Sequence, residues 1–303
     1  CPFHRMLMRF VLALSLTHFL HHANALLGSF PAVSRPILSY HTLKTYRRAR
    51  SIAIFEDDDF SGQTGQWPYS DADLGRVDSS DDSRFYDTPR LVTHIDNQAI
   101  SSLTSYYAEE LRSGSDVLDI CSSWISHLPE KLPLGRVAGL GMNAEELARN
   151  DRLTEFVTSD LNQDPRLPFD DESFDVVNCV VSVDYLTQPR EVFQEIYRVL
   201  RPQGKCLISF SNRCFPTKAV AMWLQADDIG RMTIVASYFH YSAAWKSIEA
   251  LDIKPPNPPP PRPPSAGDIF ATGGNAAFSW VRTTMVGAKE AMTDPMFVIK
   301  GTK

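Results

Sequence analysis

The spacing of apolar residues predicts a chain in which strands alternate with helices. Between residues 91 and 111, apolar side chains recur every three or four positions, which is typical of an amphipathic helix that ends near Gly114. Short apolar runs follow, separated by amphipathic segments. The runs predict strands at 116–120, 136–140, 155–158, 174–181 and 205–210, and the amphipathic segments predict helices at 144–153 and 190–200. Such alternation is typical of a parallel sheet that is covered by helices on both faces and binds ligands where its strands end.

The pattern becomes less regular after residue 210. It predicts helices at 218–226 and 232–239 and strands at 247–253 and 295–300. The long connection before the last strand predicts that this strand returns antiparallel to the others. Part of that connection, between Pro255 and Pro264, holds eight prolines and must be extended, because proline can neither continue a helix nor donate to a sheet. We interpret 255–266 as an insertion; the alternative is a docking segment for an aromatic groove.

The first 55 residues have the composition of a targeting segment. Two arginines precede an apolar stretch at 10–20 that is too short to span a bilayer, and a small-x-small cleavage pattern follows at 23–25. Residues 1–25 therefore resemble a signal peptide, and the basic, Ser- and Thr-rich residues 26–55 resemble a transit peptide. The two in series resemble the bipartite presequences of secondary plastids and predict a plastid (chloroplast) protein. The alternatives are a secreted or endomembrane-lumen protein and a membrane-proximal basic arm.

Charge is distributed unevenly along the 303 residues. Residues 1–55 hold seven Lys and Arg and no acid, residues 56–87 hold ten acids and two Arg, and the remainder carries −5. The acidic stretch at 56–83 predicts a disordered linker, which leaves 84–303 as the folded domain. Because Lys and Arg drive binding to phosphate backbones, an acidic domain disfavours nucleic acid and favours a small molecule as partner. We expect no stable membrane insertion of the mature form, and the oligomeric state stays open.

The five cysteines form no C-x-x-C pair and no dense framework. Several lie in runs that predict buried strands, so we expect free thiols in the core rather than disulfides. A zinc site would need clustered Cys and His ligands, and the sequence shows none. No metal is therefore expected.

Two sequence runs carry a family resemblance. Residues 167–177 read L-P-F-D-D-E-S-F-D-V-V and residues 195–205 read E-I-Y-R-V-L-R-P-Q-G-K. Together with Val117-Leu118-Asp119 and Ser159-Asp160-Leu161, in this order and spacing, they resemble the class I methyltransferases that use S-adenosylmethionine, in particular the type 11 methyltransferase domain. The resemblance covers about residues 84–303. The runs at 122–129 and 210–215 look more narrowly like a subgroup from plants, algae and bacteria.

The resemblance implies a fold and an activity. The fold would be an α/β, Rossmann-like sheet of seven strands, mostly parallel with an antiparallel last strand, and with helices on both faces. The activity would be in-line transfer of a methyl group from S-adenosyl-L-methionine to a small-molecule acceptor. In the family a Gly-rich loop after the first strand approaches the amino-acid end of the cofactor, an acid after the second strand binds the ribose, and an acid after the third binds the adenine amine.

The resemblance assigns cofactor-binding residues, with departures. Asp160 and Leu161 fall after the third strand, as the family requires. The loop contributes Asp119, Cys121, Ser122 and Ser123, but here Cys121 and Ser123 replace the first two glycines, and a Cβ restricts φ. The two serines either bind the cofactor or satisfy the backbone of their own turn. Gly141 stands where the ribose acid is expected, which leaves Asn143 as the nearest polar substitute.

The departures keep two other functions open. The first is a non-catalytic module of the same fold that binds a partner or a regulatory ligand. The second is an NAD(P)-binding oxidoreductase, because residues 139–144 match the dinucleotide pattern G-x-G-x-x-A. That pattern normally follows the first strand of its fold, whereas here another strand precedes it, so the oxidoreductase is less favoured.

Few residues are candidates for catalysis, because a sulfonium is already a good leaving group and a base is needed only for a protonated nucleophile. His94, on the predicted leading helix, and Asp184 and Tyr185, after the fourth strand, are the candidates. Their structural alternatives are a helix-surface histidine for His94 and an aromatic wall for Tyr185. Asn212 and Arg213 are candidates for binding an anionic group of the acceptor, and the alternative for Arg213 is an ion pair with a surface acid.

Overall fold

A computed structural model describes residues 50–56, 67–254 and 293–303 of the chain. The residues before Arg50, which include most of the predicted presequence, and the proline-rich insertion at 255–266 lie outside the described residues. Within the described part, no helix is both long and apolar enough to cross a membrane. The four cysteines in this part, at positions 121, 179, 206 and 214, are free thiols.

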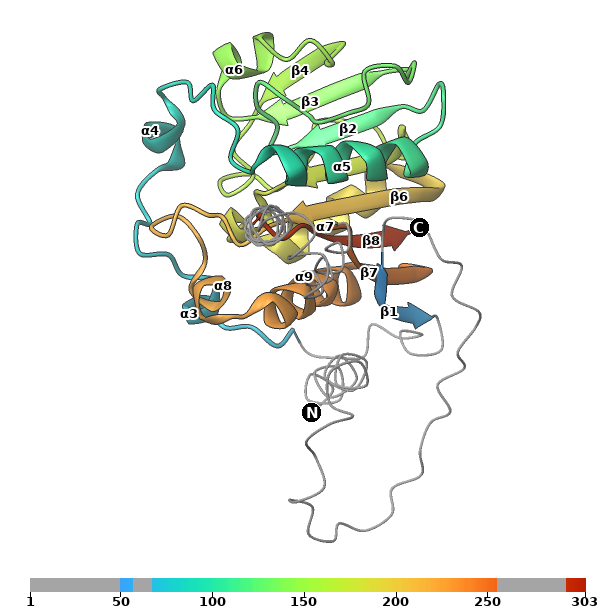
Figure 1. Cartoon of the computed structure of the whole chain (residues 1–303). Coiled ribbons are helices and arrows are strands. Elements are labelled where there is room, and N and C mark those ends of the chain that lie inside the picture. Colours follow the sequence, from blue (N-terminus) through green and yellow to red (C-terminus); the bar gives the residue numbers. More distant parts are fainter. Residues whose placement is uncertain (1–49, 57–66, 255–292) are drawn as a thin grey trace, which may run out of the picture.

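One eight-stranded sheet forms the centre of the structure (Figure 1). Its strands are β1 (Arg50–Glu56), β2 (Val117–Ile120), β3 (Val137–Gly141), β4 (Glu155–Thr158), β5 (Phe174–Val180), β6 (Leu200–Phe210), β7 (Ser247–Asp252) and β8 (Phe297–Thr302). The order across the sheet is β1-β7-β8-β6-β5-β2-β3-β4. Strands β2 to β6 pair in parallel, and β8 is antiparallel to both of its neighbours. The predicted sheet of seven strands with an antiparallel last strand is confirmed, and β1 adds an eighth strand antiparallel to β7.

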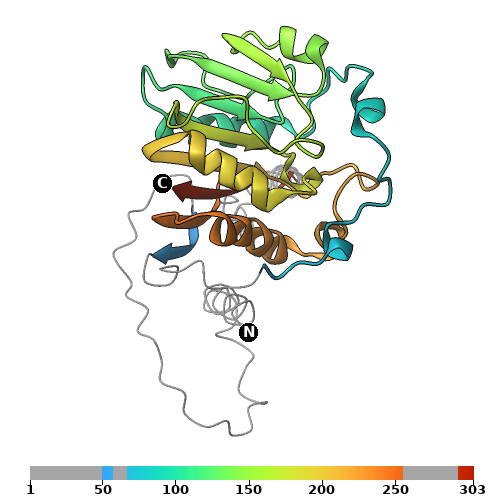
Figure 2. The same ribbon diagram turned by 180° about the vertical axis from the view of Figure 1, so that it is seen from behind.

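Helices cover both faces of the sheet. They are α3 (Asp71–Leu74), α4 (Asp82–Tyr86), α5 (Asn97–Glu110), α6 (Ala144–Ala148), α7 (Pro189–Val199), α8 (Ala221–Gln225) and α9 (Asp228–Ser242). Figure 1 shows α5 in front of the sheet, and Figure 2 shows α7 and α9 on the other face. Because neighbouring residues of a strand point to opposite faces, Val117 and Val176 pack in the cluster that includes α5, whereas Leu118 and Val177 pack with α7 and α9.

The leading helix is shorter than predicted. The apolar spacing from residue 91 predicted a helix over 91–111, but α5 begins at Asn97, because the Asp96 side chain caps it by accepting the backbone N–H groups of Gln98 (3.0 Å) and Ala99 (2.8 Å). Residues 91–95 form a loop in which Leu91 and Val92 are exposed. His94 therefore lies before the helix and not on it.

The prediction of a disordered linker is wrong for residues 67–83. The rings of Trp67 and Tyr69 both lie 6.2 Å from that of Tyr238 in α9, and the Tyr69 hydroxyl lies 2.7 Å from the Ser237 Oγ. Two short helices, α3 and α4, follow. We call residues 67–95 the N-terminal arm. Its local sequence is acidic, but partners far along the chain order it, so the folded unit begins well before residue 84. Residues 50–55, assigned to the transit peptide by composition, form most of β1.

Candidate functional site

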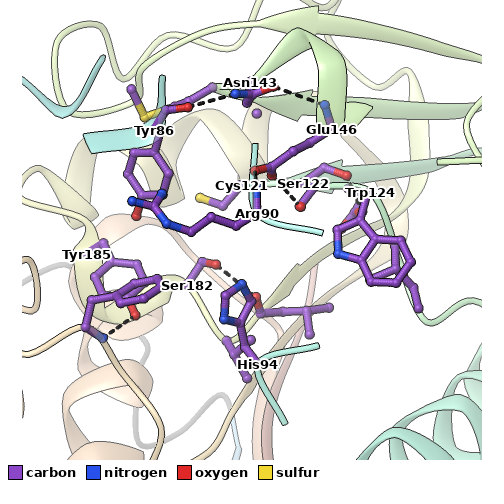
Figure 3. Close-up of a pocket in the computed structure, with 18 of the residues that line it drawn as sticks. Tyr86, Arg90, His94, Cys121, Ser122, Trp124, Asn143, Glu146, Ser182 and Tyr185 are labelled. Carbon is purple, nitrogen blue, oxygen red and sulfur yellow. Dashed lines mark hydrogen bonds between the residues drawn. The ribbon is translucent and has the colours of Figure 1, made fainter. Parts of the chain in front are cut away.

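A cavity of about 290 Å³ opens where β2, β3, β4 and β5 end, and the N-terminal arm closes one side of it (Figure 3). Most of the predicted site residues line it. These are His94, Asp119, Cys121, Ser122, Ser123, Asn143, Asp160, Leu161, Tyr185 and Arg213. Asp184 and Asn212 do not line it. The topology thus brings together residues that are up to 119 positions apart in the sequence, as the carboxyl ends of parallel strands do.

The loop after β2 keeps a turn that favours glycine. Cys121 has φ of +52°, in the left-handed region that residues with a Cβ rarely adopt. The cysteine at this position therefore does not prevent the turn, although its backbone is strained. Its backbone shape is the one that a glycine would adopt more easily.

Gly141, at the end of β3, has no room for a side chain. A Cβ placed there would lie 2.1 Å from the backbone oxygen of Ser122. This packing excludes an acid at the position where the family places one, and it accounts for the glycine. It also removes the support for the dinucleotide pattern at 139–144, because the glycine approaches protein backbone and not open space for a pyrophosphate.

The two serines of the loop are bound to carboxylates. The Ser122 hydroxyl donates to Asp119 Oδ2 at 2.6 Å, and Ser126 donates to the same oxygen at 2.6 Å, while Asn178 donates to Asp119 Oδ1 at 2.5 Å. Burial raises the pKa of Asp119 to about 6. Ser123 donates to Glu146 Oε2 at 2.5 Å. The hydroxyls therefore order the loop internally, by a route that neither of the two sequence interpretations foresaw.

Asn143 holds the N-terminal arm rather than presenting its amide to the cavity. Its Oδ1 caps α6 by accepting the N–H groups of Glu145 and Glu146, and its Nδ2 donates to the backbone oxygens of Tyr86 (2.8 Å) and Asp87 (3.1 Å). Both ends of the side chain are thus engaged, and its predicted role as a ribose ligand is not supported by this geometry.

Glu146 is a site residue that the sequence reasoning missed. Its side chain lines the cavity with only 8% of the residue exposed, and its Oε1 accepts the backbone N–H of Arg90 at 2.6 Å. Asn143-x-x-Glu146 reads as an ordinary helix-capping pattern, which conceals any other role. The available signal was an acid in the first turn of the helix after Gly141. Figure 3 shows the Glu146 carboxylate beside Ser122 and Cys121.

Asp160 lies in the turn after β4, where the sequence placed it. Its Oδ1 accepts the backbone N–H of Asn162 at 2.9 Å, and the Asn162 amide donates to Asp82 (2.9 Å) and to the backbone oxygen of Tyr185 (2.9 Å). Leu161 is buried beside it. The turn is therefore fixed from both the arm and the end of β5.

His94 faces the cavity from the arm. Its ring lies 5.4 Å from the ring of Phe215 in an edge-to-face arrangement. Burial lowers its pKa below the ordinary value of 6.5. The imidazole is therefore neutral at physiological pH and can accept a proton.

The two candidates after β5 differ from the prediction. Asp184 is buried away from the cavity, and burial raises its pKa to about 8, so it cannot contact a substrate there. Tyr185 lines the cavity, but its hydroxyl accepts the backbone N–H of Phe215 at 2.8 Å and burial raises its pKa. Tyr185 thus matches the alternative of an aromatic wall.

The predicted anion-binding pair is not assembled. Arg213 is 64% exposed and forms an ion pair of 2.8 Å with Asp294. Its structural alternative predicted an ion pair, although with a surface acid, whereas Asp294 is buried. Asn212 is exposed outside the cavity, within hydrogen-bond distance of Ser211 (3.3 Å). A different arginine, Arg90 of the arm, lines the cavity. The run at 85–90 belongs to the subgroup resemblance, but the sequence assigned Arg90 no role in the site, since the arm had to fold over the cavity first.

Comparison with known proteins connects this geometry to a family. A family model described as a methyltransferase domain matches residues 123–208. The demethylmenaquinone methyltransferase of Lactobacillus johnsonii is 29% identical over 106 residues, which are 32% of this chain and 43% of that protein. Cycloartenol-C-24-methyltransferase 1 of Oryza sativa subsp. japonica is 31% identical over 107 residues, 32% of this chain and 30% of that protein. The chain thus spans less than half the length of these relatives.

A solved structure that aligns with this chain is an S-adenosylmethionine-dependent methyltransferase from Mesorhizobium loti. It aligns with a TM-score of 0.39 and 14% identity, over 67% of this chain and 98% of that chain.

Proposed function

This chain belongs to the class I S-adenosylmethionine-dependent methyltransferases, and we propose that it transfers a methyl group from S-adenosylmethionine to a small-molecule acceptor. The observation that carries the proposal is the left-handed turn at Cys121, which lies in the cavity at the carboxyl ends of the parallel strands. The backbone at this position therefore has a conformation that a glycine adopts easily. The cysteine in place of glycine favoured a non-catalytic module in the sequence analysis, but with this backbone conformation it is no longer an argument against an enzyme.

The residues of the cavity fit the cofactor, with one substitution. Asp160 is available after β4 for the adenine amine. Glu146 takes the place of the acid that Gly141 cannot provide, because each of its two oxygens accepts one hydrogen bond and retains a lone pair for a ribose hydroxyl. Asp119 orders the loop that would contact the amino-acid end of the cofactor.

The chemistry needs little from the protein besides alignment. The bound cofactor supplies a methyl group on a sulfonium, which is already activated. Ile95, Leu140 and Val180 line the cavity and exclude water from the reacting groups. His94, neutral because of its lowered pKa, accepts the proton of an acceptor that arrives protonated.

Calorimetric titration of the full chain with S-adenosylhomocysteine tests the proposal. We expect micromolar binding that weakens by about tenfold in Glu146→Gln, since the variant loses charge-assisted hydrogen bonds. Glu145→Gln is the matched control, because Glu145 is exposed and pairs with Arg149 at 2.6 Å on the outer face of α6. Binding of NAD⁺ without binding of S-adenosylhomocysteine would reject the proposal in favour of an oxidoreductase.

We also propose delivery to a plastid, on the composition of residues 1–49 alone. A fluorescent protein fused behind these residues should enter the plastid of an alga with a secondary plastid. The same fusion with the arginines of 26–49 replaced by serine should stop in the endomembrane system. Secretion of the unaltered fusion would reject the proposal.

A further inference from the structure

Arg90 lies against three aromatic rings at the cavity. Its guanidinium carbon is 4.3 Å from the ring centre of Phe85, 5.8 Å from that of Tyr86 and 5.6 Å from that of Phe215. Figure 3 shows the side chain extended across the cavity toward Tyr86. Among the described residues, its guanidinium makes one hydrogen bond, from Nη2 to the backbone oxygen of Phe85 at 2.7 Å. The rings therefore hold the flat face of the guanidinium, and N–H donors remain at its edge.

The charge of Arg90 is not balanced by a carboxylate. Four acids line the cavity, and each one bonds to groups other than the Arg90 guanidinium. Glu146 bonds to the backbone N–H of Arg90 and not to its guanidinium. The other cavity arginine, Arg213, pairs with Asp294. Within residues 50–56, 67–254 and 293–303, Arg90 is thus the arginine of this cavity that has no acidic partner.

The backbone around Arg90 is fixed to the cofactor side of the cavity. Glu146 holds the Arg90 N–H, and Asn143 holds the backbone of Tyr86 and Asp87. His94 follows four residues later and faces the same cavity. A group bound by Arg90 is therefore anchored on the same segment that carries the proposed base, while apolar residues such as Val180 and Ile95 surround the remainder.

We infer that the acceptor is an apolar or aromatic molecule that carries an oxyanion group, which is either a carboxylate or a phosphate. Arg90 binds this group. The inference rests on the proposed methyl transfer and adds its substrate class. A guanidinium that is stacked on rings and lacks a counter-ion presents a planar fork of donors that matches an oxyanion in two hydrogen bonds. An uncharged acceptor would leave the charge of Arg90 unsatisfied inside the occupied cavity.

Fluorine NMR titration of the full chain tests the inference with three probes of similar size. They are 4-fluorobenzoate, 4-fluorophenyl phosphate and the neutral 4-fluorobenzamide. We expect at least one of the two anions to bind about tenfold more tightly than the amide, and the tighter anion identifies the source of the oxyanion. Arg90→Gln should reduce this preference to less than twofold. Arg84→Gln, which removes an exposed arginine of α4 that does not line the cavity, should keep it.

S-adenosylhomocysteine is titrated into the same samples to separate the two proposals. An anion preference in a wild-type protein that does not bind S-adenosylhomocysteine would reject the methyl transfer and retain an oxyanion site. Equal affinity of all three probes for the wild type would overturn the inference, as would a preference that persists in Arg90→Gln. If Arg90→Gln also fails to bind S-adenosylhomocysteine, Arg90→Lys is titrated in its place. An anion preference in Arg90→Lys supports the inference. A variant that binds S-adenosylhomocysteine but shows no anion preference overturns the assignment to the charge at position 90.

Discussion

The Nζ of Lys218 lies 3.0 Å from Oδ1 of Asp82, and the two side chains are 0% and 3% exposed. Asp82 also accepts a hydrogen bond of 2.7 Å from Arg76, and Lys218 also pairs with Asp78 at 3.0 Å. This buried ionic cluster joins the N-terminal arm to the segment before α8, and so holds the arm against the cavity.

Lys218→Met should destabilise the protein by roughly 3–5 kcal/mol, because it leaves the buried Asp82 with one cation fewer. Urea denaturation measures the loss. Lys246→Met is the control, since the Lys246 side chain is exposed and its Nζ reaches only the Gln203 amide oxygen, at 3.5 Å, within the described part of the chain. Equal stability of the two variants would show that the cluster does not hold the arm.

Replacement of Cys121 should reveal the strain of its turn. Cys121→Gly and Cys121→Ala both remove the thiol, but only alanine keeps a Cβ at φ +52°. We expect the glycine variant to be more stable than the alanine variant by about 1 kcal/mol, against the usual order of these residues. Thermal denaturation of the pair tests this, and a more stable alanine variant would contradict the observed turn.

Asp184 should make stability fall as pH rises. Burial raises its pKa from 3.8 to about 8, so its contribution to stability is fully present below pH 3.8 and is lost as pH rises through 8. In Asp184→Asn the side chain cannot ionise, so its stability lacks this dependence on pH. We expect its stability relative to the wild type to improve by roughly 3–5 kcal/mol between pH 4 and pH 8, by urea denaturation at each pH. Asp119 titrates in both proteins, so a difference that is flat with pH would refute the assignment.

The proposed base predicts a pH profile. Because burial lowers the pKa of His94 below 6.5, kcat/KM should fall on the acidic side only below that pH. His94→Asn should remove this acidic limb and lower kcat about 100-fold or more, for an acceptor that arrives protonated. An unchanged limb in the variant would assign the titration to another group.

The sequence predicted the sheet well because its signals are local. Runs such as Val117–Ile120 and Phe174–Val180 are mainly apolar and almost entirely buried, which is typical of a parallel sheet that is covered on both faces. The predicted start of α5 was wrong, because apolar residues continue the helical spacing from residue 91 although the helix begins only after its cap, Asp96.

Much of the site depends on contacts that local composition cannot show. The arm looked like a linker because the residues that order it lie far along the chain: Trp67 packs against Tyr238, and Asp82 pairs with Lys218. Glu146 was hidden by a capping pattern, and Arg90 became a site residue only when the arm folded over the strand ends. By contrast, Asp160 was identified because its place follows directly from the end of a strand.

Strand β1 covers the outer side of β7, whose other side pairs with β8. Without residues 50–56, the backbone N–H and C=O groups of Ser247–Asp252 would form an open edge, ready to pair with the same edge of another copy. A chain cut after Glu56 would therefore be prone to aggregate even with its cavity intact. If a leader is removed from this protein, cleavage before Arg50 would keep that edge protected.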